Sequence, residues 1–213
     1  MRIVIAGGHG KIALLLSRLL RDAGHEPVGI IRNPEHVSDV REAGAEPLVL
    51  DLERSTAEDL AAHLAGADAV VFAAGAGPNS GAARKFTMDR DGAILLADAA
   101  ERAGVQRIVV VSAHRTDRFD PGSDDVFQVY LRAKSEADAD IRGRTLDWTI
   151  VRPGSLTDDP PTGQVQVGDT VPPGRIPRAD VAAVLASVLT EGRAIRRQFE
   201  LMSGSIPIAD AAF

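Results

Sequence analysis

A tyrosine and a lysine, Tyr130 and Lys134, lie four positions apart in the segment YLRAK. Residues at this spacing share one face of a helix, so the lysine ammonium can approach the tyrosine phenol. A nearby cation lowers the pKa of a tyrosine toward neutrality, which makes its hydroxyl a usable proton donor or acceptor. The spacing therefore predicts a proton-transfer role for Tyr130 with Lys134 beside it. The alternative is an amphipathic tyrosine followed by a surface lysine.

A glycine-rich turn near the N-terminus, GGHGKIA at residues 7–13, joins an apolar run to a helical pattern. Gly8, Gly10 and Ala13 fit G-x-G-x-x-G/A, and Gly7 begins a looser version of the same pattern. Glycines let a backbone approach a pyrophosphate, and the helix that follows offers free N–H groups and the positive end of its dipole. The turn predicts a dinucleotide site; the alternative is an ordinary strand-to-helix turn. The cofactor contacts expected from it are Gly7, His9, Gly10, Lys11 and Ile12.

Arg32 ends the second apolar run, about 20 residues beyond the glycines. In dinucleotide sites this position meets the adenosine ribose. A carboxylate there would hydrogen-bond the 2′-hydroxyl, whereas an arginine suits a 2′-phosphate. No carboxylate stands beside Arg32 until Glu35, so the sequence favours NADP(H) over NAD(H). A solvated arginine at the end of a strand is the alternative.

Further candidate contacts follow the next two apolar runs. Asp51 can accept a hydrogen bond from the adenine amino group while Leu52 packs on the ring, or Asp51 can instead cap a helix. Ala73, Ala74 and Gly75 are small enough for the backbone to pass close to the ribose or the nicotinamide. The five histidines are scattered without metal-ligand spacing and cysteine is absent, so no metal site is predicted.

The elements that must position these residues follow from regularly alternating apolar runs and helical patterns. Runs such as residues 69–73 and 107–112 lack polar alternation, as expected for parallel strands buried on both faces. Glycines 24, 44, 66 and 104 each follow a helical pattern, where a left-handed C-cap favours glycine. The sequence predicts one α/β domain over residues 1–213, a doubly wound parallel sheet of Rossmann-type topology. We expect strands near 2–6, 27–31, 46–50, 68–73, 106–112 and 147–151, and helices near 11–23, 35–43, 56–65, 87–103, 125–142 and 178–190.

Two loops, residues 75–85 and 152–175, are longer than this alternation requires. Both follow the ends of strands, at the edge where open α/β sheets bind ligands. We expect the second to form a substrate loop at about 152–175, with Asp158 and Asp159 solvated within it. A flexible excursion without a role is the alternative.

Composition narrows the class of protein. The net charge of −6 and the lack of a long basic block argue against nucleic-acid binding. No stretch approaches the ~18 uninterrupted apolar residues of a membrane span. The absence of cysteine excludes disulfides and thiolate nucleophiles. We therefore expect a cytoplasmic protein that acts on a small molecule, without a nucleic-acid or membrane partner.

Taken together, these segments resemble the short-chain dehydrogenase/reductase superfamily in its atypical, NAD(P)-binding branch. That branch includes proteins similar to NmrA and to biliverdin reductase B/flavin reductase. The resemblance spans almost the whole chain and is carried by GGHGKIA, DRDGA at 89–93, VVVSA at 109–113, YLRAK, DWTIVRPG at 147–154 and RADVA at 178–182. The segment from 147 to 156 is particularly similar to small bacterial NAD(P)H-binding and epimerase/dehydratase-like proteins.

The resemblance implies Tyr130 as the acid/base and Lys134 on the nicotinamide ribose. It also implies Ser112 as the holder of a substrate carbonyl, and Pro153 and Gly154 beside the nicotinamide. Many active relatives carry two or three consecutive hydroxyl residues where this chain reads Ser-Ala-His at 112–114. Either Ser112 serves, or His114 supplies the polar contact, or the catalytic set is incomplete.

Two functions remain as hypotheses. The first is an NADP(H)-dependent oxidoreductase that transfers hydride to a small carbonyl, quinone or flavin-like acceptor. The second is a non-catalytic NADP(H)-binding protein that senses redox state, as the similarity to NmrA allows. The chain is short for a nucleotide-sugar enzyme of the extended branch. The helical patterns near 87–103 and 125–142 are compatible with a homodimer or a monomer.

Overall fold

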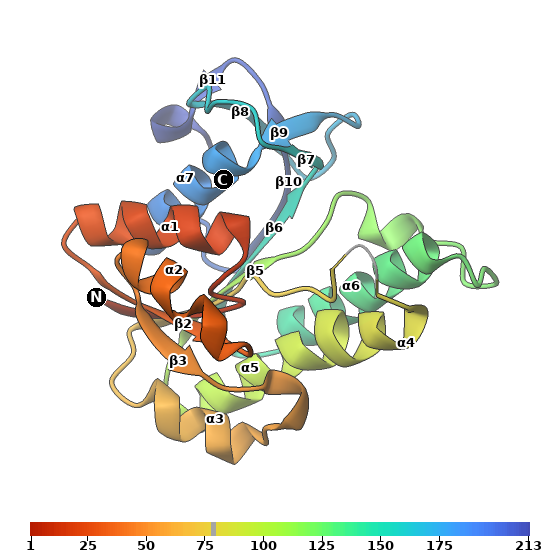
Figure 1. The fold of residues 1–213 in the computed structure, drawn as a ribbon. Coiled ribbons are helices and arrows are strands. Elements are labelled where there is room, and N and C mark those ends of the chain that lie inside the picture. Colours follow the sequence, from red (N-terminus) through yellow and green to blue (C-terminus); the bar gives the residue numbers. More distant parts are fainter. Residues whose placement is uncertain (78–79) are drawn as a thin grey trace.

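A computed structural model describes residues 1–77 and 80–213, and its core is one large sheet with helices on both faces (Figure 1). Within the described residues the strand order is β11-β8-β10-β6-β5-β4-β1-β2-β3. The six strands from β3 to β6 are parallel, in the predicted doubly wound order, and β10 extends this parallel set beyond β6. The strands of this sheet are β1 (Arg2–Ala6), β2 (Glu26–Ile31), β3 (Glu46–Val49), β4 (Ala69–Phe72), β5 (Arg107–Val111), β6 (Asp147–Pro153), β8 (Gln164–Gly168), β10 (Arg197–Ser203) and β11 (Ile206–Pro207).

Two layers of helices cover the sheet, and alternate residues of the same strand face each layer. Ile3 and Ile5 pack in the core that includes α1 and α7, whereas Val4 and Ala6 pack in the core that includes α3, α5 and α6. All four side chains are fully buried, which explains the uninterrupted apolar run. The helices are α1 (Lys11–Asp22), α2 (Val37–Glu42), α3 (Ala57–Leu64), α5 (Asp91–Ala103), α6 (Val126–Arg142) and α7 (Arg178–Thr190), with short 3-10 turns at η1 (Pro34–His36), η2 (Leu52–Arg54), η4 (Thr116–Arg118) and η5 (Ile208–Asp210).

The predicted helix over 87–103 begins earlier and changes its winding. It starts with α4 (Ala82–Arg84), continues through the π-helical segment η3 (Lys85–Arg90) and becomes α-helical in α5. Wide turns of this kind are frequent at functional sites. Lys85 and Asp89, both in this π-helical segment, are buried. The loop predicted over 75–85 therefore ends in a helix, and its residues 78–79 lie outside the described residues.

The loop predicted over 152–175 contains short strands. It contains the end of β6, then β7 (Ser155–Thr157) and β8, and it leads into β9 (Arg175–Pro177), which pairs with β7. These strands are short and set among prolines and glycines, which hid them in the sequence. The buried Asp180 carboxylate of α7 accepts hydrogen bonds from the amides of Thr162 and Gly163, which ties the connection before β8 to the helix.

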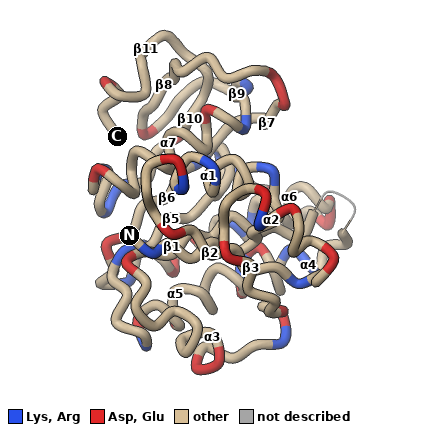
Figure 2. The backbone as a smooth tube through the Cα atoms, turned by 60° about the vertical axis from the view of Figure 1, so that its left-hand side comes forward, with Lys and Arg blue, Asp and Glu red and all other residues tan. Residues whose placement is uncertain are grey.

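Local backbone geometry agrees with the glycine pattern. The φ angles of Gly24, Gly44, Gly66 and Gly104 are 81°, 82°, 74° and 74°, so each adopts the predicted left-handed conformation just after a helix. Acidic and basic residues are interspersed along the chain rather than gathered by sign (Figure 2).

Candidate functional site

The glycine turn is held against its neighbours at backbone distance. Gly7 has a φ of +82°, and a Cβ atom there would lie 2.6 Å from the Cα of Ala74. A Cβ on Gly8 would lie 2.6 Å from the Cα of Gly29 in β2. The first intrahelical bond of α1 runs from the Leu14 amide to the Gly10 carbonyl, so the N–H groups of residues 11–13 have no intrahelical acceptor. The turn therefore has the form of a cradle for a pyrophosphate.

A cavity of about 290 Å³ opens beside this turn, at the ends of β1, β2 and β4. It brings together most of the predicted cofactor residues: Gly7, His9, Gly10, Arg32, Asp51, Leu52, Ala73, Ala74 and Gly75. Apolar residues from β2 and the end of β3, including Ile30 and Leu50, complete its wall. Its lining contains the residues that were predicted to contact the adenosine half of a dinucleotide. We call it the adenosine cavity.

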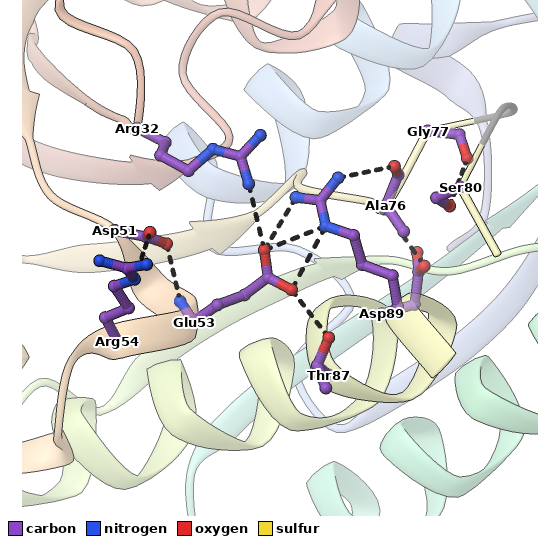
Figure 3. Close-up of polar contacts among 10 residues, drawn as sticks. Arg32, Asp51, Glu53, Arg54, Ala76, Gly77, Ser80, Thr87 and Asp89 are labelled. Carbon is purple, nitrogen blue, oxygen red and sulfur yellow. Dashed lines mark hydrogen bonds and ion pairs between the residues drawn. The ribbon is translucent and has the colours of Figure 1, made fainter. Parts of the chain in front are cut away.

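Glu53 accepts hydrogen bonds from three side chains beside the adenosine cavity (Figure 3). Its carboxylate accepts hydrogen bonds from Arg84 at 2.8 Å, from Thr87 at 2.7 Å and from Arg32 at 3.3 Å. The hydrogen bonds from Arg84 hold the pKa of Glu53 below its usual range. Arg32 is therefore not an isolated solvated arginine, although its side chain remains 56% exposed. Glu53 and Arg84 could not be predicted from the sequence, because the contact joins segments about thirty positions apart.

Asp51 uses one carboxylate oxygen as a cap. Its Oδ1 accepts a hydrogen bond from the Glu53 amide at 3.1 Å, at the start of η2. The capping interpretation of Asp51 is confirmed. Asp51 also lines the adenosine cavity, so the adenine contact remains a prediction beside it.

A second cavity of about 680 Å³ meets the first at Ala73, Ala74 and Gly75. We call it the substrate cavity. It contains the predicted Ile12, Ser112, Tyr130 and Lys134. Apolar side chains form much of its wall: Val111, Val126, Phe127 and Leu156. Lys85 and Asp89 of η3 also line it and were not predicted as site residues.

Lys134 is buried, and its ammonium group forms an ion pair with the Asp89 carboxylate. Its Nζ donates to the Val111 carbonyl at 3.1 Å and lies 3.6 Å from the Asp89 carboxylate. Burial, together with the negative charges of Asp89 and Asp138, raises the pKa of Tyr130 above its ordinary value. The prediction that Lys134 brings this pKa toward neutrality is wrong, because burial of the phenol raises the pKa and the charges of Asp89 and Asp138 raise it further. Tyr130 is a protonated phenol that faces the substrate cavity.

Ser112 is tied to a buried charge network behind the cavity. Its hydroxyl donates to Asp138 Oδ2 at 2.8 Å, so its proton does not point to a substrate oxygen. Arg152 donates to the same oxygen at 2.8 Å and also pairs with Asp117 at 2.5 Å. Burial raises the pKa of Asp138, and the positive charge of Arg152 opposes this shift. Among the described residues the other oxygen, Oδ1, has no hydrogen-bond partner.

Three predicted contacts lie elsewhere. His114 Nε2 lies 2.9 Å from the Val171 carbonyl and 3.1 Å from Glu200, so His114 connects structural segments. Pro153 and Gly154 line neither the adenosine cavity nor the substrate cavity. A Cβ on Gly154 would lie 2.5 Å from the Gly174 carbonyl oxygen, which accounts for glycine there by close packing. Leu156, two residues further on, is the residue of this segment that reaches the substrate cavity.

Lys11 points away from the adenosine cavity and forms an ion cluster. Its Nζ lies 2.5 Å from Asp158, whose other oxygen accepts a hydrogen bond from Arg178 at 2.7 Å. These hydrogen bonds and charges hold the pKa of Asp158 below its usual range. Asp158 is exposed, as expected, with 58% of its side chain accessible, and its carboxylate also links the start of α1 to the start of α7.

A metal-binding cluster and a membrane-spanning helix are both absent from the described part of the chain. No group of three or more histidine, aspartate or glutamate residues there is arranged to hold a metal ion. None of the described helices has the length and apolarity needed to cross a membrane.

Comparison with known proteins connects this geometry to a family. Residues 7–192 match the family described as NAD(P)H-binding. "Uncharacterized sugar epimerase YhfK" of Bacillus subtilis is 34% identical, over 99% of this chain and 98% of that protein. The solved structure of "Putative NAD-dependent epimerase/dehydratase" from Bacillus halodurans is 40% identical, with a TM-score of 0.90 over 98% of this chain and 97% of that one. The structure of the oxidoreductase ylbE from Lactococcus lactis is 26% identical, with a TM-score of 0.87 over 99% and 94% of the two chains. The chain belongs to the NAD(P)H-binding family, within the atypical short-chain dehydrogenase/reductase group.

Proposed function

We propose that the protein is an NADP(H)-dependent oxidoreductase whose acceptor is a small carbonyl, quinone or flavin-like compound. The observation that carries the proposal is the junction of the two cavities at Ala73, Ala74 and Gly75. A dinucleotide with its adenosine in the first cavity would have its nicotinamide end near the second, which Tyr130 lines. When bound, the cofactor supplies the hydride.

The residues of the substrate cavity provide the remaining chemistry. Burial keeps Tyr130 protonated, so its phenol is suited to donate a proton to the oxygen of a carbonyl that is being reduced. Phe127 and Leu156 give the cavity apolar surface against which the acceptor can pack. The buried Lys134–Asp89 pair fixes the inner face of the cavity behind Tyr130.

Replacing Arg32 by alanine tests the choice of cofactor. Arg32 is exposed enough to reach a 2′-phosphate beside Glu53. Loss of a charge-assisted arginine–phosphate contact is expected to weaken NADPH binding about 10- to 100-fold and NADH binding by less than about 3-fold. Titration of nicotinamide fluorescence measures both affinities. Arg54→Ala is the control, because this side chain is 87% exposed and lies outside the cavity lining. Equal losses for NADPH and NADH in Arg32→Ala would remove the assignment.

Replacing Tyr130 by phenylalanine tests the proton donor. Carbonyl reduction is expected to fall about 10²- to 10⁴-fold, whereas flavin reduction, which needs no proton from tyrosine, is expected to stay within about 2-fold. Because the pKa of Tyr130 is raised, the rate of carbonyl reduction by the unaltered protein should not decline through tyrosine ionisation between about pH 6 and 9. Stopped-flow measurement of NADPH oxidation gives both results. Full carbonyl turnover by Tyr130→Phe would refute the role.

A second function, NADP(H) binding for redox sensing without turnover, is favoured by one observation. The Ser112 proton is directed to Asp138 and the Lys134 charge to Asp89, so neither group is directed to a substrate oxygen. Consumption of NADPH with quinones, flavins or aldehydes distinguishes the two functions. Tight NADPH binding without consumption across that panel would favour the sensor.

A further inference from the structure

Lys85 is a buried cation in the wall of the substrate cavity. It is the first residue of η3 and is only 6% exposed. Its Nζ donates to the Gly77 carbonyl at 2.7 Å and lies 5.5 Å from the centre of the Tyr130 ring. Gly77 and Tyr130 both line the substrate cavity, so the ammonium lies at the cavity surface beside the proposed proton donor.

No carboxylate of the described residues forms an ion pair with Lys85. Asp89, one helical turn further along, pairs with the other cavity lysine, Lys134. A carbonyl oxygen and the face of an aromatic ring only partly replace the water that a buried ammonium has lost. An anionic group in the cavity would complete this compensation.

The remaining carboxylate of the cavity lining is already engaged. Asp125 caps α6, and its Oδ1 accepts hydrogen bonds from the amides of Phe127 at 3.0 Å and Gln128 at 3.2 Å. Much of the remaining wall is apolar. The described lining thus carries two lysines and two aspartates, and Lys85 is the lysine of the two that has no ion-pair partner among the described residues. A singly charged anionic group on an apolar molecule matches this position.

We propose that Lys85 binds the carboxylate of the substrate, and that the substrate class is an apolar carbonyl or quinone compound that carries one carboxylate. The proposal rests on the oxidoreductase function for the hydride step. The carboxylate site itself depends only on Lys85 and the cavity. Lys85 is then a specificity-determining residue, while Tyr130 handles the proton.

A matched pair of aldehydes tests this site. 4-Formylbenzoate carries one carboxylate, and methyl 4-formylbenzoate is its neutral counterpart. Isothermal titration calorimetry of the protein, with and without saturating NADP⁺, is expected to show the acid binding at least about tenfold more tightly than the ester. In Lys85→Met the two affinities should become equal, with ester binding and NADPH binding unchanged. Lys85→Arg should restore part of the preference, and Arg102→Met, at an exposed position on α5, should retain it fully.

Several outcomes would overturn the proposal. An acid that binds no more tightly than its ester, or not at all, removes the site. A Lys85→Met protein that loses NADPH binding along with both aldehydes would assign Lys85 to the cofactor or to the framework. Calorimetry separates this proposal from the proposed function, because it needs no turnover. A preference for the acid without NADPH consumption retains the carboxylate site and rejects the oxidoreductase, and consumption of NADPH with equal binding of acid and ester does the reverse.

Discussion

Gly7→Ala is expected to abolish useful cofactor binding and to destabilise the fold. The new Cβ would lie 2.6 Å from the Cα of Ala74, and both partners are backbone, so the turn itself must move. The positive φ of +82° adds the cost of a left-handed alanine. Together we expect a loss of about 3 kcal/mol in unfolding free energy, from steric overpacking and backbone strain. Displacement of the pyrophosphate cradle should weaken NADPH binding on the order of 100-fold. Urea unfolding and fluorescence titration measure the two effects.

Gly24→Ala provides a matched control for backbone strain. Gly24 has almost the same φ, +81°, but a Cβ there meets nothing within 4 Å. This variant should lose only about 1 kcal/mol in unfolding free energy and keep its NADPH affinity. If the two variants were equally stable and bound NADPH equally well, the close approach of Gly7 to Ala74 would have no energetic importance.

Arg152→Met is expected to cause the largest loss of stability in the charge network behind the cavity. Removing the guanidinium leaves Asp138, which is fully buried, without its cation. Breaking such a pair costs about 3–5 kcal/mol. The pKa of Asp138 is already raised by burial, so the folded protein favours its neutral form more than the unfolded chain does. Stability therefore falls as pH rises through the folded pKa, and the loss in Arg152→Met should be larger at pH 8 than at pH 5.

Denaturant unfolding of a double variant checks the cause. Arg152→Met combined with Asp138→Asn removes the buried charge and should recover about 1–2 kcal/mol relative to Arg152→Met alone. Arg197→Met is the surface control, because its pair with Asp169 is exposed on both sides; its effect should stay within about 0.5 kcal/mol. A double variant that is no more stable than Arg152→Met would contradict the charge explanation.

The elements that carry the dinucleotide site were predictable because their signals are local. The glycine turn, the unbroken run of β1 and the left-handed Gly104 each reflect constraints among neighbouring residues. The position of the adenosine cavity residues at one edge of the sheet was also predictable, because parallel strands end on the same side.

The electrostatics of the substrate cavity were not predictable from spacing. The pairing of Lys134 with Asp89 depends on how the π-helical η3 faces α6. The periodicity of the sequence does not indicate this contact. Burial of the Tyr130 phenol, together with the charges of Asp89 and Asp138, raises its pKa instead of lowering it. Lys85 was missed because it lies in a segment that was predicted to be a loop. Strand β10 was missed because only its inner residues, such as Phe199 and Leu201, form a short apolar pattern.

The position of β10 in the sheet has a consequence for biosynthesis. β10 pairs with β6 on one side and with β8 on the other, yet it follows both in the chain. While the ribosome is still synthesising α7, the outer edge of β6 has no partner strand and β8 has no place in the sheet. An unpaired edge of this kind invites association with other nascent chains. β10 therefore has to enter between two segments that were made before it, and its arrival gives both of them a partner strand.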